Sequence, residues 1–148
     1  MTDDIEIKDL AEVVVRFSGD SGDGMQLAGN IFSTVSATVG NGISTFPDYP
    51  ADIRAPHGSL TGVSGYQVHI GSGQVYTPGD QCDVLVAMNA AALKTQYKYA
   101  KPQATIIIDT DSFSPTDLKK ADFQTDDYLE ELSIDPDRVV ACPISTMV

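Results

Sequence analysis

The chain has 148 residues, of which 42% are hydrophobic and 20% charged, and this is the size and composition of one globular domain with a substantial core. Nine lysines and arginines against 21 aspartates and glutamates give a net charge of −12, which repels phosphate backbones and argues against nucleic-acid binding. No apolar run approaches the roughly 18 residues of a membrane span. The acidic N-terminus, MTDDIEIKDL, lacks the features of a signal peptide.

The number and spacing of the cysteines argue against a metal-binding protein. The two cysteines, Cys82 and Cys142, are far apart in the sequence and match no ligand spacing for zinc or for an iron–sulfur cluster. We therefore expect a cytoplasmic protein with two reduced core thiols, no metal site, no membrane contact and no nucleic-acid partner.

The first half of the chain holds all twelve glycines, which separate short predicted elements. A β-branched run at residues 12–17 predicts a buried strand that breaks into a glycine-rich loop. After the loop, apolar residues recur at helical spacing and predict a helix with one buried face: Ala28, Ile31, Phe32, Val35 and Val39. The run Gly40-Asn41-Gly42 predicts the end of this helix.

After this helix, residues 43–46 predict a short strand, and residues 47–58, with three prolines, predict an irregular loop. Residues 59–70 are rich in β-formers, and the turn Gly71-Ser72-Gly73 predicts a hairpin with residues 74–77. Because this hairpin carries few charges and apolar residues on both faces, we expect it to contact partner subunits, with Val63 and Val68 as the test positions.

The second half alternates strands and helices more plainly. Strands are predicted at residues 83–88, 104–108 and 138–142, with a helix from an Asn89 cap to about residue 100 and weak helical character over 115–132. The pattern predicts an α/β fold: a three-layer α/β/α domain with a mostly parallel sheet, a glycine-rich strand-to-helix loop and an inserted β-hairpin. A helix should follow the last strand to cover it, so we expect residues 1–148 to be a single domain at the front of a longer subunit.

The glycine loop, FSGDSGDGMQLAG, is the most informative stretch. A strand that feeds such a loop at a helix N-terminus presents backbone N–H groups and the positive helix end to a ligand, often a phosphate. The spacing G-x-x-G-x-G differs from the dinucleotide pattern, and a methionine stands where a P-loop has lysine. The candidate cofactor-binding residues are Gly19, Gly22, Gly24 and Met25. Alternatively, the glycines only make the turn and let the helix pack closely on the sheet.

A second candidate lies in the proline-stiffened loop YPADIRAPHGS. Arg54 is the one basic residue between Arg16 and Lys94, and it either clamps a carboxylate or phosphate or holds the loop to a nearby aspartate. His57 has no partner placed by spacing to complete a triad, so no catalytic residue is predicted.

Three further polar residues lie on a predicted strand or directly after one. Asp109 and Asp111 end a strand, where α/β sheets place site residues, although such residues more often cap the next turn. His69 lies on a strand and is interpreted as a packing or surface residue.

Together the runs VVVRFSGDSGDGMQLAGNIF, FPDYPADIRAPHGSLTGVSGYQVHIGS and DVLVAMNAAAL resemble the gamma domain of 2-oxoacid:ferredoxin (acceptor) oxidoreductases. They are most similar to the N-terminal part of the alpha subunit of 2-oxoglutarate:ferredoxin oxidoreductases. The resemblance covers residues 11–148. It departs from much of the wider family at Asp20 and Asp23, where many gamma domains have a glycine–glutamine pattern.

The resemblance implies a part of an enzyme complex that oxidatively decarboxylates a 2-oxoacid, 2-oxoglutarate being the first choice, forms the acyl-CoA and reduces ferredoxin. The resemblance further implies that thiamine diphosphate, magnesium and iron–sulfur clusters are bound by the alpha and beta parts and by other components of the complex. This chain alone binds none of them. Coenzyme A is a substrate of the complex. The isolated domain is expected to be inactive. Two alternative hypotheses are that the chain is a stand-alone nucleotide- or acyl-CoA-binding module, or that it is a purely structural docking subunit.

Overall fold

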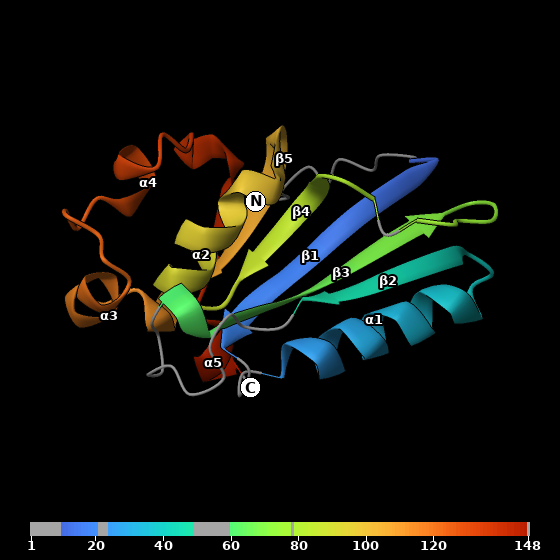
Figure 1. The fold of residues 1–148 in the computed structure, drawn as a ribbon, viewed down its shortest axis with the longest axis horizontal. Coiled ribbons are helices and arrows are strands. Elements are labelled where there is room, and N and C mark those ends of the chain that lie inside the picture. The colour runs from blue at the N-terminus through green and yellow to red at the C-terminus, as the bar shows by residue number, and fades with distance from the viewer. Residues whose placement is uncertain (1–9, 21–23, 49–59, 78, 148) are drawn as a thin grey trace, which may run out of the picture.

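A mixed sheet forms the centre of the molecule (Figure 1). The computed structural model describes residues 10–20, 24–48, 60–77 and 79–147. Its six strands lie in the order β2-β3-β1-β4-β5-β6. The strands are β1 (Glu12–Asp20), β2 (Gly42–Asp48), β3 (Val63–Gly71), β4 (Cys82–Ala87), β5 (Ala100–Asp109) and β6 (Val139–Cys142). Strands β1, β4, β5 and β6 run parallel, and β3 is antiparallel to both of its neighbours. The predicted α/β class is confirmed.

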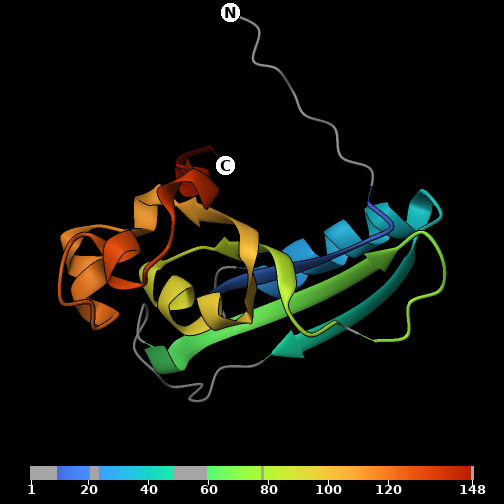
Figure 2. The same ribbon diagram turned by 90° about the horizontal axis from the view of Figure 1, so that it is seen from above.

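Helices lie on both faces of this sheet. They are α1 (Met25–Thr38), α2 (Ala90–Gln96), α3 (Pro115–Lys120), α4 (Tyr128–Glu131) and α5 (Ile144–Met147), with 3₁₀ turns at Leu60–Gly62, Tyr97–Tyr99, Thr110–Ser112 and Pro136–Arg138. Helix α1 packs on β1, β2 and β3, whereas α2 packs on the opposite face (Figure 2). Among the described helices, none has the length and apolar character needed to cross a bilayer.

Local sequence signals set where the helices of the second half begin. The side chain of Asn89 accepts a hydrogen bond from the backbone N–H of Ala92 at 2.7 Å, and α2 starts there as predicted. Helix α3 begins at a capping box, in which Ser114 and Asp117 each accept from the other's backbone N–H, with Pro115 in the first turn.

Two apolar clusters hold the layers together. The larger one lies between the sheet and the second-half helices, and its largest fully buried side chains are Leu85, Leu93, Ile106 and Ile108. The smaller one lies beneath α1 and contains Tyr66, Val68 and Ile70 of β3. Phe17 and Phe32 pack against it, and their own rings meet edge-to-face with centroids 5.7 Å apart. The larger cluster therefore covers one face of the sheet, and the smaller one covers the other face over β1, β2 and β3.

The predicted hairpin at residues 59–77 is wrong in its pairing. Residues 74–77 form no strand, because β3 is already paired along its length with β1 on one side and β2 on the other. The antiparallel element inserted before β4 is therefore the β2–β3 pair. Val63 and Val68, the expected contact positions, are 7% and 0% exposed in the chain's own core, so they do not form a free surface.

The predicted buried face of α1 also needs correction. Phe32 and Ala28 are half-buried, but Ile31, Val35 and Val39 are 57%, 60% and 73% exposed. Besides Phe32, the glycine Gly29 faces the sheet, where it lies directly against the ring of Tyr66 and leaves no room for a Cβ atom. Close helix–sheet approach, rather than apolar spacing, selects the inward face of this helix.

Candidate functional site

The carboxyl ends of the parallel strands meet at one edge of the sheet, where α/β proteins place ligands. Ser18, Ala87, Ile108 and Ala141 lie side by side in register on β1, β4, β5 and β6. The residues that follow each of them therefore lie at this one edge of the sheet. The N-terminus of α1 is connected to this edge through the loop after β1.

Two of the predicted glycines are placed by the structure. Gly19 belongs to β1 rather than to the loop, because the strand continues through Asp20, and its carbonyl accepts a 3.3 Å hydrogen bond from the Ser64 hydroxyl. Gly24 is the N-cap of α1 with a left-handed φ of 74°, a conformation that favours glycine. Its role as a turn residue is clear from this angle.

The N-terminus of α1 is the positive end of a 14-residue helix. Met25 is the first helical residue, Gly24 offers no capping side chain to the first-turn N–H groups, and the first turn holds no acidic residue. The positive end of a helix of this length is equivalent to about half an elementary charge. The other predicted binding residues, Gly22 and Arg54, lie outside the described residues, as does His57.

Asp109 and Asp111, at the end of β5, serve the fold. Asp109 is fully buried, and its carboxylate accepts hydrogen bonds from the Ser145 hydroxyl at 2.5 Å and from the Asp111 backbone N–H at 3.2 Å. Asp111 accepts from the Thr146 backbone N–H at 2.8 Å. The two carboxylates thus cap the turn after β5 and anchor α5, which confirms the capping interpretation.

Sequence reasoning missed a buried arginine at the centre of the sheet. Arg16 is 4% exposed and donates to the side chains of Gln96 at 2.7 Å and Gln67 at 3.0 Å. Its guanidinium also stacks on the ring of Tyr99, 4.3 Å from the centroid. These contacts join β1 and β3 to α2 and the following turn. A single arginine inside the β-branched run was the available signal.

The two thiols differ in their surroundings. Cys82 is fully buried, and this burial raises the pKa of its thiol to about 11, despite the opposing effect of Arg16. Cys142 is half-buried at the end of β6. Both are free thiols, as expected from the sequence.

His69 is a structural residue, as interpreted from the sequence. Its Nδ1 atom lies 2.6 Å from the carbonyl oxygen of Thr77, and its Nε2 atom lies 3.1 Å from a carboxylate oxygen of Glu12. These contacts fix the segment after β3 against the start of β1.

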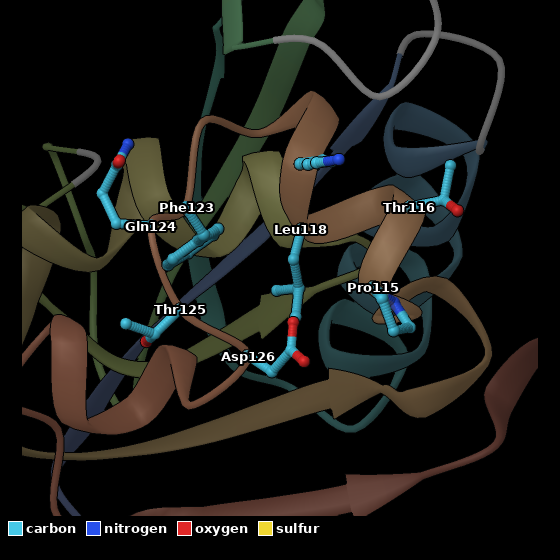
Figure 3. A pocket seen from close by; sticks show the side chains of 8 residues that line it. Pro115, Thr116, Leu118, Phe123, Gln124, Thr125 and Asp126 are labelled. Atoms are coloured by element: carbon cyan, nitrogen blue, oxygen red, sulfur yellow. The ribbon is translucent and has the colours of Figure 1, made fainter.

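A hollow of about 490 Å³ lies beside α3 (Figure 3). Leu118 and Phe123, both nearly buried, form its apolar part, and Lys119 and Asp126 are among its polar lining residues. None of the predicted site residues lines it. The hollow has one lysine and one aspartate, so it offers no net charge for an anionic ligand.

The described residues hold no cluster of three or more histidine, cysteine or acidic side chains that fits a metal ion. The whole sequence has two cysteines, fewer than the four thiolates that an iron–sulfur cluster takes. The residues present therefore do not fit an iron–sulfur cluster.

Comparison with known proteins defines the class. Residues 14–147 match the family model described as pyruvate ferredoxin/flavodoxin oxidoreductase, so the chain belongs to this family. Over 116 residues it is 47% identical to the 2-oxoglutarate oxidoreductase subunit KorA of Mycobacterium tuberculosis, a match that covers 78% of this chain and 18% of that protein.

Solved structures agree with this assignment. A 2-oxoglutarate:ferredoxin oxidoreductase from Magnetococcus marinus, solved with 2-oxoglutarate, coenzyme A and succinyl-CoA, matches with a TM-score of 0.66 and 25% identity over 93% of this chain and 21% of that one. A gamma subunit of a keto/oxoacid ferredoxin oxidoreductase from Geobacter sulfurreducens matches with a TM-score of 0.52 and 28% identity, over 70% of this chain and 53% of that one.

The match covers only a part of each of these relatives. The chain spans about a fifth of the length of the mycobacterial and Magnetococcus proteins and about half of the Geobacter subunit. The same fold therefore occurs both within a longer polypeptide and within a shorter subunit.

Proposed function

We propose that the chain is the gamma part of a 2-oxoacid:ferredoxin oxidoreductase that acts on 2-oxoglutarate and supports coenzyme A-dependent oxidative decarboxylation to the acyl-CoA. The observation that carries this proposal is the 47% identity to a 2-oxoglutarate oxidoreductase subunit. The agreement of the fold with the Magnetococcus enzyme supports it. Alpha and beta parts and ferredoxin are the proposed partners, and the cytoplasm is the proposed compartment.

Within this complex, thiamine diphosphate, magnesium and iron–sulfur clusters belong to the other parts. Thiamine diphosphate supplies the carbanion stabilisation that decarboxylation of a 2-oxoacid requires. The contribution proposed for this chain is to help position coenzyme A, through Gly19, Gly22, Gly24 and Met25 at the start of α1 and through the guanidinium of Arg54.

Charge supports a local site of this kind. Coenzyme A is an anion, and a domain with a net charge of −12 repels it at long range, so binding needs a positive element nearby. The N-terminus of α1 provides one, because no acidic side chain occupies its first turn. Arg54 would add a charge-assisted, bidentate contact.

Purification of the native assembly through a tag on this chain tests the assignment. We expect thiamine diphosphate, iron and acid-labile sulfide to co-purify with it. An assembly that contains none of these, or a chain that purifies alone with a bound nucleotide or acyl-CoA, would replace the proposal with the stand-alone binding module.

Substitution of Arg54 by alanine in the assembled enzyme tests the coenzyme A contact. Loss of a charge-assisted contact of about 1.5–3 kcal/mol should raise the KM for coenzyme A about 10- to 150-fold. The KM for the 2-oxoacid should stay the same, because that site belongs to other parts. If the KM for coenzyme A is unchanged, or if both constants rise equally, Arg54 serves the loop structure alone.

A further inference from the structure

One side of the molecule carries apolar side chains that the described part of the chain leaves uncovered. On α1, three residues at four-residue intervals point away from the sheet: Leu27 is 64% exposed, Ile31 57% and Val35 60%. Residues spaced by four form one ridge along a helix, the form that packs into the groove of another element. The sequence has no charged residue between Asp23 and Asp48, so this ridge also lacks the charged border of an ordinary solvent-facing helix.

The same side of the sheet carries further apolar side chains. Phe17, Val86, Ile107 and Val140 lie in register across β1, β4, β5 and β6. Phe32 of α1 covers Phe17, but Val86 and Ile107 are only half-buried, and Val140 on β6 is 46% exposed. Among the described elements, α1 packs on the β1–β2–β3 half of the sheet, and the four-residue α5 contacts β5 where it ends.

The ridge and the sheet row lie on the same side of the sheet, because Phe32 of α1 packs against Phe17, which is in register with Val86, Ile107 and Val140. We define the open face by its six apolar residues: Leu27, Ile31, Val35, Val86, Ile107 and Val140. Parallel strands are normally covered on both faces, and this face is the exception here.

We propose that the open face is the docking surface for the catalytic part of the oxidoreductase, the polypeptide that makes up the other four-fifths of the longer relatives. This inference rests on the proposed function. It also replaces the contact surface predicted at Val63 and Val68, which the fold buries in the domain's own core. The docking element is uncharged and apolar, because a charge placed against this face would lose its hydration without gaining an ionic partner.

Size favours this occupant over a second copy of α1. Stable interfaces bury about 800 Å² and about 20–30 residues on each partner. Helix α1 has 14 residues, and only its outer ridge is available, so a helix pair alone falls short of that area. An occupant that covers both the ridge and the sheet row is needed, and the relatives carry such additional chain.

Cysteine labelling of the assembled enzyme tests the proposal without charge or large volume changes. Ile31→Cys and Val140→Cys are made in a Cys142→Ser background, with Tyr76→Cys as the matched control, since Tyr76 is 82% exposed and is not one of the open-face residues. We expect maleimide to label Ile31→Cys and Val140→Cys at least 10-fold more slowly than Tyr76→Cys. Urea should remove this protection. Equal labelling rates at all three positions in the folded, active assembly would overturn the proposal.

A cross-linker at the same positions identifies the occupant. A photoreactive residue at Ile31 or Val140 should join a peptide from the catalytic part, and a peptide from a second copy of residues 1–148 would overturn the inference. Failure of the docking surface and failure of the proposed function give different results. Native assemblies that oxidise no 2-oxoacid contradict the function, whereas an active assembly with a freely labelled open face contradicts only the docking surface.

Discussion

At the residue scale, buried polar groups in this chain have identifiable tasks. The position of Asp109 after a strand made it a candidate for either a site residue or a cap of the next turn. The structure shows a cap, because Asp109 is buried and both of its carboxylate oxygens accept hydrogen bonds from this chain. Arg16 was not predicted, because a single arginine in an apolar run gives no sign of the glutamines and the aromatic ring that fold around it.

Removal of the Asp109 carboxylate should release α5. Asp109→Ala leaves the Ser145 hydroxyl and the Asp111 N–H without their acceptor, and we expect a loss of about 1–3 kcal/mol in the free energy of unfolding. Urea denaturation measures it. Ser145→Ala is the control, and in the double variant the two losses should not add, because they remove the same contact. Full additivity would contradict the contact.

The buried thiol of Cys82 predicts a dependence of stability on pH. The pKa of this thiol is about 11 in the folded chain, against an ordinary value of 9.0, so between these values the folded chain holds a proton that the unfolded chain releases. Stability should therefore fall as pH rises from 9 to 11, by on the order of 3 kcal/mol in total. Urea denaturation of the wild type and of Cys82→Ala across this range isolates the contribution. A parallel pH dependence in both would contradict it.

Among the elements, the strands and the capped helices were predictable from the sequence. The side of α1 that packs on the sheet was not. Short β-branched runs gave β1, β4, β5 and β6, and the Asn89 cap gave α2, because these signals are local. The apolar residues of α1 occupy more than one side of the helix, so spacing alone could not select the buried one. The choice depends on Gly29 and Tyr66, which are distant in sequence.

The contact between α1 and β3 gives a direct test of this explanation. A Cβ atom at Gly29 would lie 2.1 Å from the Tyr66 ring, so Gly29→Ala should push the helix away and cost about 1–3 kcal/mol, although alanine favours helices. Thr34→Ala, at an exposed position of the same helix, should leave stability unchanged or raise it slightly. Thermal unfolding of both variants compares them. A stabilised Gly29→Ala would contradict the close packing.

At the scale of the whole molecule, the sequence predicted the layers but not the strand order. Alternating strands and helices indicate a mostly parallel sheet. The position of β3 between β1 and β2 depends on pairing between segments far apart in the chain, and the local turn signal at Gly71-Ser72-Gly73 favoured a hairpin instead. Of the candidate site, the sequence predicted the part that depends on local signals: Gly24 precedes the first residue of α1, as the glycine loop indicates. Gly22 and Arg54 lie outside the described residues.

We propose that this domain works within an enzyme that oxidises 2-oxoglutarate in a coenzyme A-dependent reaction. The most direct measurement is the steady-state rate of acceptor reduction by the native assembly with a panel of 2-oxoacids, with and without coenzyme A. We expect the highest kcat/KM with 2-oxoglutarate, a strict requirement for coenzyme A, and formation of the matching acyl-CoA. An assembly that reduces the acceptor with no 2-oxoacid, or that forms no acyl-CoA, would contradict the proposed function.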